Sequence, residues 1–281
     1  MKNRQLWIAA GLLALAGLVI FHYKAVRLGP PLVPDSTSPV WSVEARLRLD
    51  AAGGPVKVAL RIPRDPPGFA VLDEHFVSYR FGLDTQSDGA GRAAVWSKRR
   101  AQAQETLYYR TVVFAENGAQ DEAAVPPFPE PPPREEPFRS AADALIREVR
   151  QVSADVPTFA TQLVRRLADP DPGDPAEIFR SGGESRLALV RAAVDLLSDA
   201  RIPARAVQGV ELVDSRRDAP LRTWLAVHDG EAWIHVDPET GERGLPRDLL
   251  VLTRTDGPLA EVAGGTLSGL ELSVIRHAYG S

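Results

Sequence analysis

GGESRLALVRAAVDLLSDARIPARAVQGV, residues 182–210, and LRTWLAVHDGEAWIHVDPETG, residues 221–241, are the stretches of sequence that decide the fold. The first begins with Glu184 and Ser185, and Ile202-Pro203 ends its periodic part. Between them the apolar side chains recur at helical spacing, at Leu187, Val190, Val194 and Leu197. This pattern predicts a helix followed by a strand.

The second stretch predicts a β-hairpin. Two runs that suit strands, Trp224–His228 and Glu231–Asp237, flank Asp229-Gly230, which favours a two-residue type I′ turn. In the register that this turn sets, Arg222 lies directly opposite Asp237 on one face of the sheet. We therefore predict an ion pair between Arg222 and Asp237. The alternative is an ordinary exposed strand pair worth about 0.2–1 kcal/mol.

The order of these features, a helix, then IPAR, a strand, TWLAV and WIHVDPETG, resembles the transglutaminase-like, papain-type core. In that family a Cys at the helix start, a His opening the first hairpin strand and an Asp ending the second form a catalytic triad. The matching positions here are Arg186, Arg222 and Asp237, so the Asp alone is retained, and the chain contains no Cys. The resemblance therefore implies an inactive domain with no cofactor, because no thiolate nucleophile exists.

A cleft that has lost its catalytic groups can still bind a ligand, and the first hypothesis is a non-catalytic module that binds a peptide or amide. Its candidate ligand-binding residues are the three triad positions and three side chains of the same hairpin: Arg186, Arg222, Asp237, Trp224, Trp233 and His235. Guanidinium groups hold carboxylates or backbone carbonyls through paired hydrogen bonds. The structural alternative places the tryptophans in the core and the arginines at the surface.

Two other functions compete with ligand binding. One is a structural spacer or an assembly surface for partner proteins. The other is a serine-dependent hydrolase with Ser185 as nucleophile, His235 as base and Asp237 as the orienting group. His235 and Asp237 would then be neighbours along one strand, roughly 6.5–7 Å apart at Cα, which disfavours the enzyme. Ser185 also lies one position from the aligned nucleophile and suits a helix cap.

Composition limits the remaining classes. The apolar and charged fractions, 44% and 25%, are ordinary for a globular protein. A net charge of −4 gives no reason to expect nucleic-acid binding. The absence of Cys excludes disulfides and thiolate metal sites, and the 5 His residues show no ligand spacing, so we predict no metal.

Residues 1–28 predict a transmembrane signal anchor. The basic residues of Met1–Arg4 precede LWIAAGLLALAGLVIF, residues 6–21, which is just long enough to cross a bilayer. A cleavable signal peptide is the alternative, since Ala14-Leu15-Ala16 fits a cleavage site, but the apolar run continues past it. With the amino terminus inside, the chain is predicted to be a single-pass inner-membrane protein with its soluble part in the periplasm. Residues 29–39 are a Pro/Ser tether.

Residues 40–116 predict a small antiparallel β-sandwich. Apolar and polar residues alternate in VEARLRL, VKVALRI, HFVSYRFGL, RAAVWSKR and TLYYRTVVF, which turn signals separate. Asp73, Glu74 and His75 interrupt this pattern, and we predict a turn at a strand end there instead of a metal or acid–base site. Arg99 and Arg100 are predicted to lie on a solvated hairpin face and not on a ligand surface.

Residues 117–138 predict a Pro-rich linker, and residues 139–281 the inactive transglutaminase-like domain. In that domain Ser140 and Thr158 are predicted helix caps. LLVLT, LAEVAGG and LELSVIR, between residues 249 and 276, are predicted strands that complete its sheet. The predicted fold class is therefore α+β: an N-terminal transmembrane helix, a small antiparallel β-sandwich and a papain/transglutaminase-like α+β domain.

The combination of a membrane segment, the altered core and a β domain reading WSVEARLRL…GGPVKVALRIP…PPGFAVLDEHF…AVWSKRR…TLYYR is more specific than the core alone. It resembles the bacterial family of inactive transglutaminase-like proteins fused to seven transmembrane helices. The sequence ends at Ser281 without a second long apolar run, which predicts a fragment or a form without that bundle. The resemblance implies an envelope peptide-modification or signalling system, with an ATP-grasp ligase and a retropepsin-like protease as partners.

Overall fold

A computed structural model describes residues 39–89, 91–101, 104–116, 125–171, 173–183 and 185–277. The predicted anchor, residues 1–28, and the tether up to residue 38 lie outside these described residues. Pro39–Ser281 forms one compact unit. Within the described ranges, no helix combines the length and the apolar character that crossing a membrane requires.

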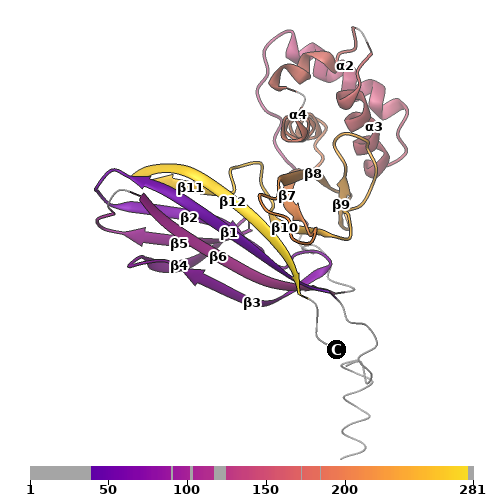
Figure 1. The fold of residues 1–281 in the computed structure, drawn as a ribbon. Helices are drawn as coiled ribbons and strands as arrows, with labels where there is room; N and C mark the ends of the chain where they lie inside the picture. The colour runs from indigo at the N-terminus through magenta and orange to yellow at the C-terminus, as the bar shows by residue number, and fades with distance from the viewer. Residues whose placement is uncertain are drawn as a thin grey trace, which may run out of the picture. The chain divides into compact units, whose positions relative to one another are not determined.

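The described part is α+β, with three antiparallel four-stranded sheets and three α-helices (Figure 1). The strand orders are β12-β1-β6-β3, β11-β2-β5-β4 and β10-β7-β8-β9. The strands are β1 Val40–Ala51, β2 Val56–Ile62, β3 Phe69–Val77, β4 Gly82–Asp88, β5 Gly91–Lys98, β6 Gln104–Ala115, β7 Ala204–Glu211, β8 Leu221–His228, β9 Trp233–Val236, β10 Leu249–Thr253, β11 Ala260–Ala263 and β12 Gly265–His277.

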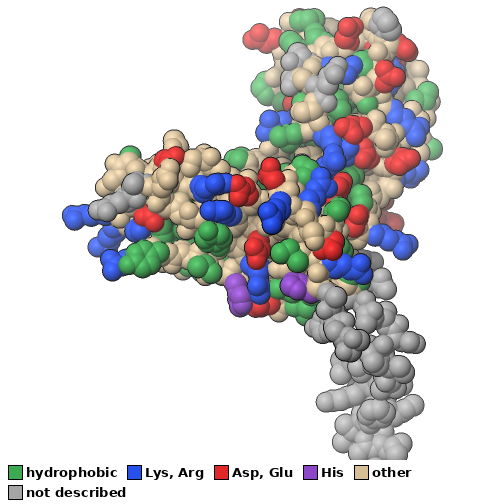
Figure 2. Space-filling model, in the orientation of Figure 1, with side chains coloured by type: hydrophobic (Ala, Val, Ile, Leu, Met, Phe, Trp, Pro, Cys, Tyr) green, Lys and Arg blue, Asp and Glu red, His purple; other side chains and the backbone are tan. Residues whose placement is uncertain are grey.

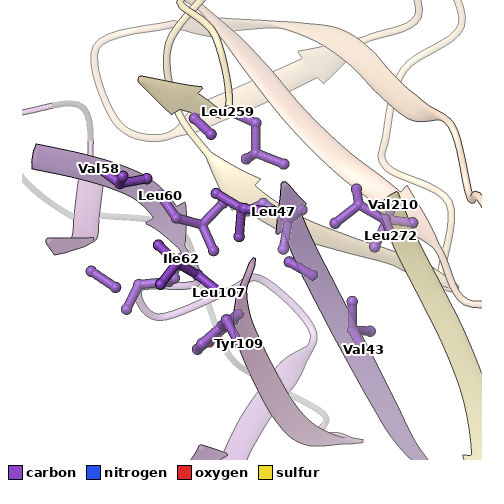
Figure 3. Close-up of a cluster of buried hydrophobic side chains, with 14 of the residues drawn as sticks. Val43, Leu47, Val58, Leu60, Ile62, Leu107, Tyr109, Val210, Leu259 and Leu272 are labelled. Atoms are coloured by element: carbon purple, nitrogen blue, oxygen red, sulfur yellow. The ribbon is translucent and has the colours of Figure 1, made fainter. Parts of the chain in front are cut away.

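The first two sheets form a β-sandwich around one hydrophobic core. Alternate residues of β1, such as Leu47 and Leu49, are fully buried, whereas Arg46 and Arg48 between them are exposed. This is the pattern of a strand with one face on a core. Figure 3 shows Leu47 close to Leu60 of the second sheet in this core.

The C-terminal strands complete the sandwich, so the prediction that residues 259–265 and 270–276 complete the transglutaminase-like sheet is wrong. β12 pairs with β1 from Val40↔His277 to Ala51↔Gly265, and β11 pairs with β2. Only β10 joins the third sheet. Alternation of side chains predicts a strand but carries no information on its partner, which is why this assignment failed.

The prediction of a turn at Asp73–His75 is also wrong, because these residues lie within β3. The pairing of β3 with β6 shifts between Val71 and Asp73, which leaves Leu72 in a bulge. Beyond the bulge, Glu74 accepts hydrogen bonds from Tyr109 Oη and Arg92 Nη1, each at 2.6 Å. The local polarity therefore reflects a bulged strand and an ion pair between the two sheets.

Three helices cover one face of the third sheet (Figure 1): α2 Phe138–Gln151, α3 Val156–Ala168 and α4 Arg186–Asp199. A 3₁₀ helix, η1 Glu177–Gly182, precedes α4. Leu163 and Leu197 on the helices share a second hydrophobic core with Leu225 and Val236 on the sheet. The helical spacing of apolar residues thus creates the layer that the sequence predicts.

The helix starts follow the expected capping chemistry at two of three places. Ser185 caps α4 and accepts a hydrogen bond from Ala188 N at 3.2 Å, as predicted. Thr158 belongs to a capping box whose N-cap is Asp155. The prediction for Ser140 is wrong, because α2 begins before it and the Ser140 hydroxyl bonds Glu136 instead.

The third sheet and the sandwich share the first hydrophobic core. Val210 of β7 and Leu250 of β10 belong to that core, and Figure 3 shows Val210 beside Leu272 of β12. Arg216, in the connection between β7 and β8, forms a β-bridge with Val274 of β12. The transglutaminase-like part is therefore packed directly on the sandwich.

Candidate functional site

The hairpin of β8 and β9 has a different register from the predicted one. His228 lies opposite Trp233 and Ala226 opposite His235, so residues 229–232 form the connection. The Asp229 carboxylate accepts hydrogen bonds from the N–H groups of Glu231 and Ala232, both at 2.8 Å. This side-chain cap stabilises a longer loop than the predicted two-residue turn, and it moves the strands past each other.

Arg186, the first residue of α4 and the predicted counterpart of a catalytic Cys, reaches the hairpin and forms the centre of the site. Its Nη2 donates to Asp237 Oδ2 at 2.7 Å and its Nη1 to Glu239 Oε2 at 2.5 Å. Its Nε donates to the Thr223 carbonyl at 3.3 Å. The guanidinium carbon lies 4.8 Å from the centre of the Trp224 ring. We call these five residues the Arg186 clamp.

The Asp237 carboxylate is held from both sides. One oxygen binds Arg186, and the other accepts hydrogen bonds from Glu239 N at 2.9 Å and Thr240 N at 3.2 Å. Partial burial raises the pKa of Asp237, but these donors outweigh burial and hold its pKa below the ordinary value. Asp237 is therefore the anionic partner of the clamp.

The Arg186 side chain is packed against its partners in the clamp and is largely shielded from solvent. The Arg186 side chain is 16% exposed, and Trp224 beneath it is 4% exposed. Thr223, whose carbonyl accepts from Arg186, is also buried. A guanidinium and an indole thus fill the space between the start of α4 and the β8–β9 hairpin.

The predicted ion pair between Arg222 and Asp237 is not formed. Arg222 Nε lies 3.3 Å from Glu211 Oε1 on β7, and the Arg222 side chain is 40% exposed. The shifted register places Asp237 nearer to Trp224 and leaves Arg222 toward β7, where Gly209 faces it. Arg186, and not Arg222, neutralises the retained aspartate.

Trp233 lies at the opposite end of the hairpin, and His235 faces Ala226 between that end and Trp224. Trp233 packs edge-on against His228, with ring centres 5.2 Å apart, and Arg205 lies 3.8 Å over the Trp233 ring. His235 is 9% exposed and His228 is 3% exposed. Arg186, Asp237 and Trp224 meet in the clamp, whereas Arg222 and Trp233 have other partners, so the structure does not bring the six predicted residues together.

The sequence analysis did not identify three contributors to these contacts: Glu239, the Thr223 carbonyl and the Arg205–His228 pair around Trp233. Glu239 had a usable signal, because it follows Asp237-Pro238 in a turn that returns toward the helix start. A backbone carbonyl has no sequence signal. Among the described residues no group of three or more His, Asp or Glu side chains is placed to hold a metal ion.

These contacts define a transglutaminase-like domain that lacks its catalytic groups. The model of the family described as inactive transglutaminase fused to 7 transmembrane helices matches residues 23–182. This match covers more than half of the chain, and the chain belongs to that family. It is therefore not an active transglutaminase, in keeping with a sequence that contains no Cys. The match ends just before Arg186, so the clamp lies beyond the matched residues.

One solved structure has a similar fold. It is described as "a Putative Cysteine Protease from Cytophaga hutchinsonii", and it aligns with a TM-score of 0.60 at 13% identity. The alignment covers 88% of this chain and 93% of that chain. At this identity the likeness shows the fold alone. No curated protein matches the chain.

Proposed function

We propose that this chain is a membrane-anchored, non-catalytic module that lies outside the cytoplasm and presents a folded surface to a partner protein. The observation that carries the proposal is the closure of the Arg186 clamp. A peptide entering this site would have to displace Arg186 from Asp237 and Glu239. Each broken charge-assisted hydrogen bond would have to be replaced, which opposes a role in reading peptides.

The path of the chain supports a position beside a membrane. Val40 and His277 lie opposite each other on β1 and β12. The start of β1 and the end of β12 therefore lie next to each other at one end of the sandwich. The family is described by its fusion to transmembrane helices. Attachment to a membrane at that end would leave the other surfaces of the module accessible.

One side of the sandwich suits contact with another protein. β3 and β4 are edge strands of their sheets, and neither has a partner strand on its outer side among the described residues. Large exposed apolar side chains gather on these strands and on the turn between them: Val71, Leu72, Val77, Tyr79 and Leu83. Open edges with apolar side chains pair readily with other chains. This feature favours assembly over the spacer role.

The experiment uses the full chain in its membrane. A photo-crosslinking residue is placed at Tyr79 or Leu83, with Arg147 on α2 as an exposed control position. We expect a discrete crosslinked partner from Tyr79 and Leu83 and none from Arg147. Equal labelling from all three positions, or none from Tyr79 and Leu83, would contradict the proposal.

A second measurement addresses the peptide-binding interpretation, which stays a prediction. The full chain in detergent is titrated with short envelope peptides that carry no run of acidic residues, alongside Arg222→Glu. We expect no saturable binding to either protein. Binding to the wild type that Arg222→Glu abolishes would show that peptides bind at the hairpin face around Arg222 and would contradict a module without peptide binding.

A further inference from the structure

We infer that the end of the sandwich farthest from Val40 and His277 carries a binding site for a carboxylate-rich peptide segment. A hollow of about 640 Å³ lies there. Its basic lining residues are Lys57 on β2, Arg80 in the turn between β3 and β4, and Lys98 and Arg99 at the end of β5. No Asp or Glu belongs to its lining. We call this feature the basic hollow.

The four basic side chains of the hollow differ in whether an acidic side chain pairs with them. Lys98 is neutralised by Glu105, whose Oε1 lies 2.5 Å from its Nζ, and it is fixed 4.9 Å from the Phe81 ring centre. Lys57, Arg80 and Arg99 are exposed and form no ion pair within the described part of the chain. The hollow therefore keeps uncompensated positive charge on three separate elements.

Uncompensated cations are not the rule on this sandwich. Arg48 pairs with Glu271, Arg61 with Asp88, and Arg92 with Glu74. Lys57, Arg80 and Arg99 have no such acidic partner within the described part of the chain. The chain as a whole is acidic, with a net charge of −4. Figure 2 shows Lys and Arg side chains gathered at this end of the strands. Converging like charges repel, and a ligand carrying carboxylates removes that repulsion.

The geometry of the rim positions the charges. Arg80 adopts a left-handed backbone conformation, with φ of 58°, and its guanidinium lies 5.0 Å over the Tyr79 ring. Gly264 lets the turn between β11 and β12 pack on the Pro55 carbonyl, because a Cβ there would lie 2.0 Å from that oxygen. The hollow is thus framed by ordered turns on both sides.

The size of the hollow and the spread of its cations favour a chain of carboxylates over a compact anion. A phosphate-sized ion would fill only a small part of 640 Å³. Arg80 and Arg99 can each bind a carboxylate through paired hydrogen bonds, and Lys57 adds a third contact. The sequence prediction placed Arg99 on a solvated face because one strand cannot show that Lys57 and Arg80 lie beside it. This site is independent of the Arg186 clamp.

The test measures binding of fluorescently labelled hexaglutamate to the full chain in detergent at low salt. The site variant is Lys57→Gln with Arg99→Gln. The matched control is Arg147→Gln with Arg150→Gln on α2, which removes the same charge from exposed positions. We expect saturable binding that weakens with salt, at least a roughly tenfold loss in the site variant, and less than about a twofold change in the control.

Other outcomes overturn the inference. Equal weakening in both variants would indicate a net-charge effect without a site, and absence of binding would remove the site altogether. Competition by equimolar inorganic phosphate would indicate a small-anion site. Binding of phosphatidylglycerol vesicles without binding of hexaglutamate would assign the hollow to a lipid surface. Circular dichroism confirms that each variant is folded before binding is compared.

Discussion

Arg186 forms a structural clamp at a position that the sequence predicts to match a catalytic Cys. It stands at the start of α4 and reaches Asp237. The sequence predicted both positions but paired Asp237 with Arg222. That pairing depends on the hairpin register, which the Asp229 side chain sets through hydrogen bonds to its own loop. Such a cap is hard to weigh against a two-residue turn signal from sequence alone.

Arg186→Ala is expected to lower the free energy of unfolding by roughly 1–3 kcal/mol, because it leaves the partly buried Asp237 carboxylate without its main partner. Arg222→Ala is the matched control. It removes an arginine from a more exposed pair and is expected to cost less than about 1 kcal/mol. Urea unfolding of both variants measures the difference. Equal losses would mean that Arg186 has no special structural role.

The lowered pKa of Asp237 predicts a dependence of stability on pH. The unfolded chain binds a proton at Asp237 more readily than the folded chain, whose carboxylate is held by Arg186. The stabilisation is therefore fully present above the ordinary pKa of 3.8 and is lost as the pH falls through the lower, folded-state pKa. We expect wild type and Asp237→Asn to differ in unfolding free energy at pH 7 and to converge near pH 2. A gap that stays constant with pH would refute this.

At the scale of single elements, the close approach of β7 to β10 depends on a glycine, Gly209. A Cβ on Gly209 would lie 2.4 Å from the Leu250 carbonyl oxygen, so Gly209→Ala is expected to cost roughly 1–3 kcal/mol. Gly54→Ala is the control, since nothing lies within 4 Å of its Cβ position. It should change stability by less than about 0.5 kcal/mol. Thermal unfolding checks both, and similar effects would show that the close approach is relieved by a small shift.

Local pattern predicted most elements and few of their partners. Helix α4 and strands β1, β2 and β6 follow from periodicity, because each buries one face. β5 was also predicted as a strand, but its residues 93–96 are all buried. The run HFVSYRFGL was predicted as one strand, but β3 ends at Val77 and β4 begins at Gly82. In the turn between them Arg80 has a left-handed conformation, and no Gly or Asn in the sequence indicates a turn at that position. The assignment of β12 failed because its partner, β1, lies at the far end of the sequence.

At the scale of the whole molecule, one hydrophobic core joins the sandwich to the third sheet. Leu250 and Val210 belong to the same core as sandwich residues such as Leu47 and Leu272. β12, which follows the transglutaminase-like sheet in the sequence, pairs with β1 at its beginning. Neither part can therefore be removed without exposing the core of the other.

Shared packing predicts cooperative unfolding of the part from Pro39 to Ser281. Far-UV circular dichroism, which is dominated by the helices, and tryptophan fluorescence should give coincident urea transitions. Leu250→Ala is expected to lower the unfolding free energy by about 2–5 kcal/mol and to move both signals together. Two separate transitions, or a shift in one signal alone, would show that the two parts fold independently.

The central claim is that Arg186 and Asp237 form a structural clamp in place of a catalytic pair, and a double-mutant cycle tests it most directly. Unfolding free energies are measured at pH 7 for wild type, Arg186→Ala, Asp237→Asn and the double variant. The account predicts a favourable coupling free energy of about 1–3 kcal/mol, because each single change leaves the other group without its partner. Additive effects, with coupling near zero, would contradict it.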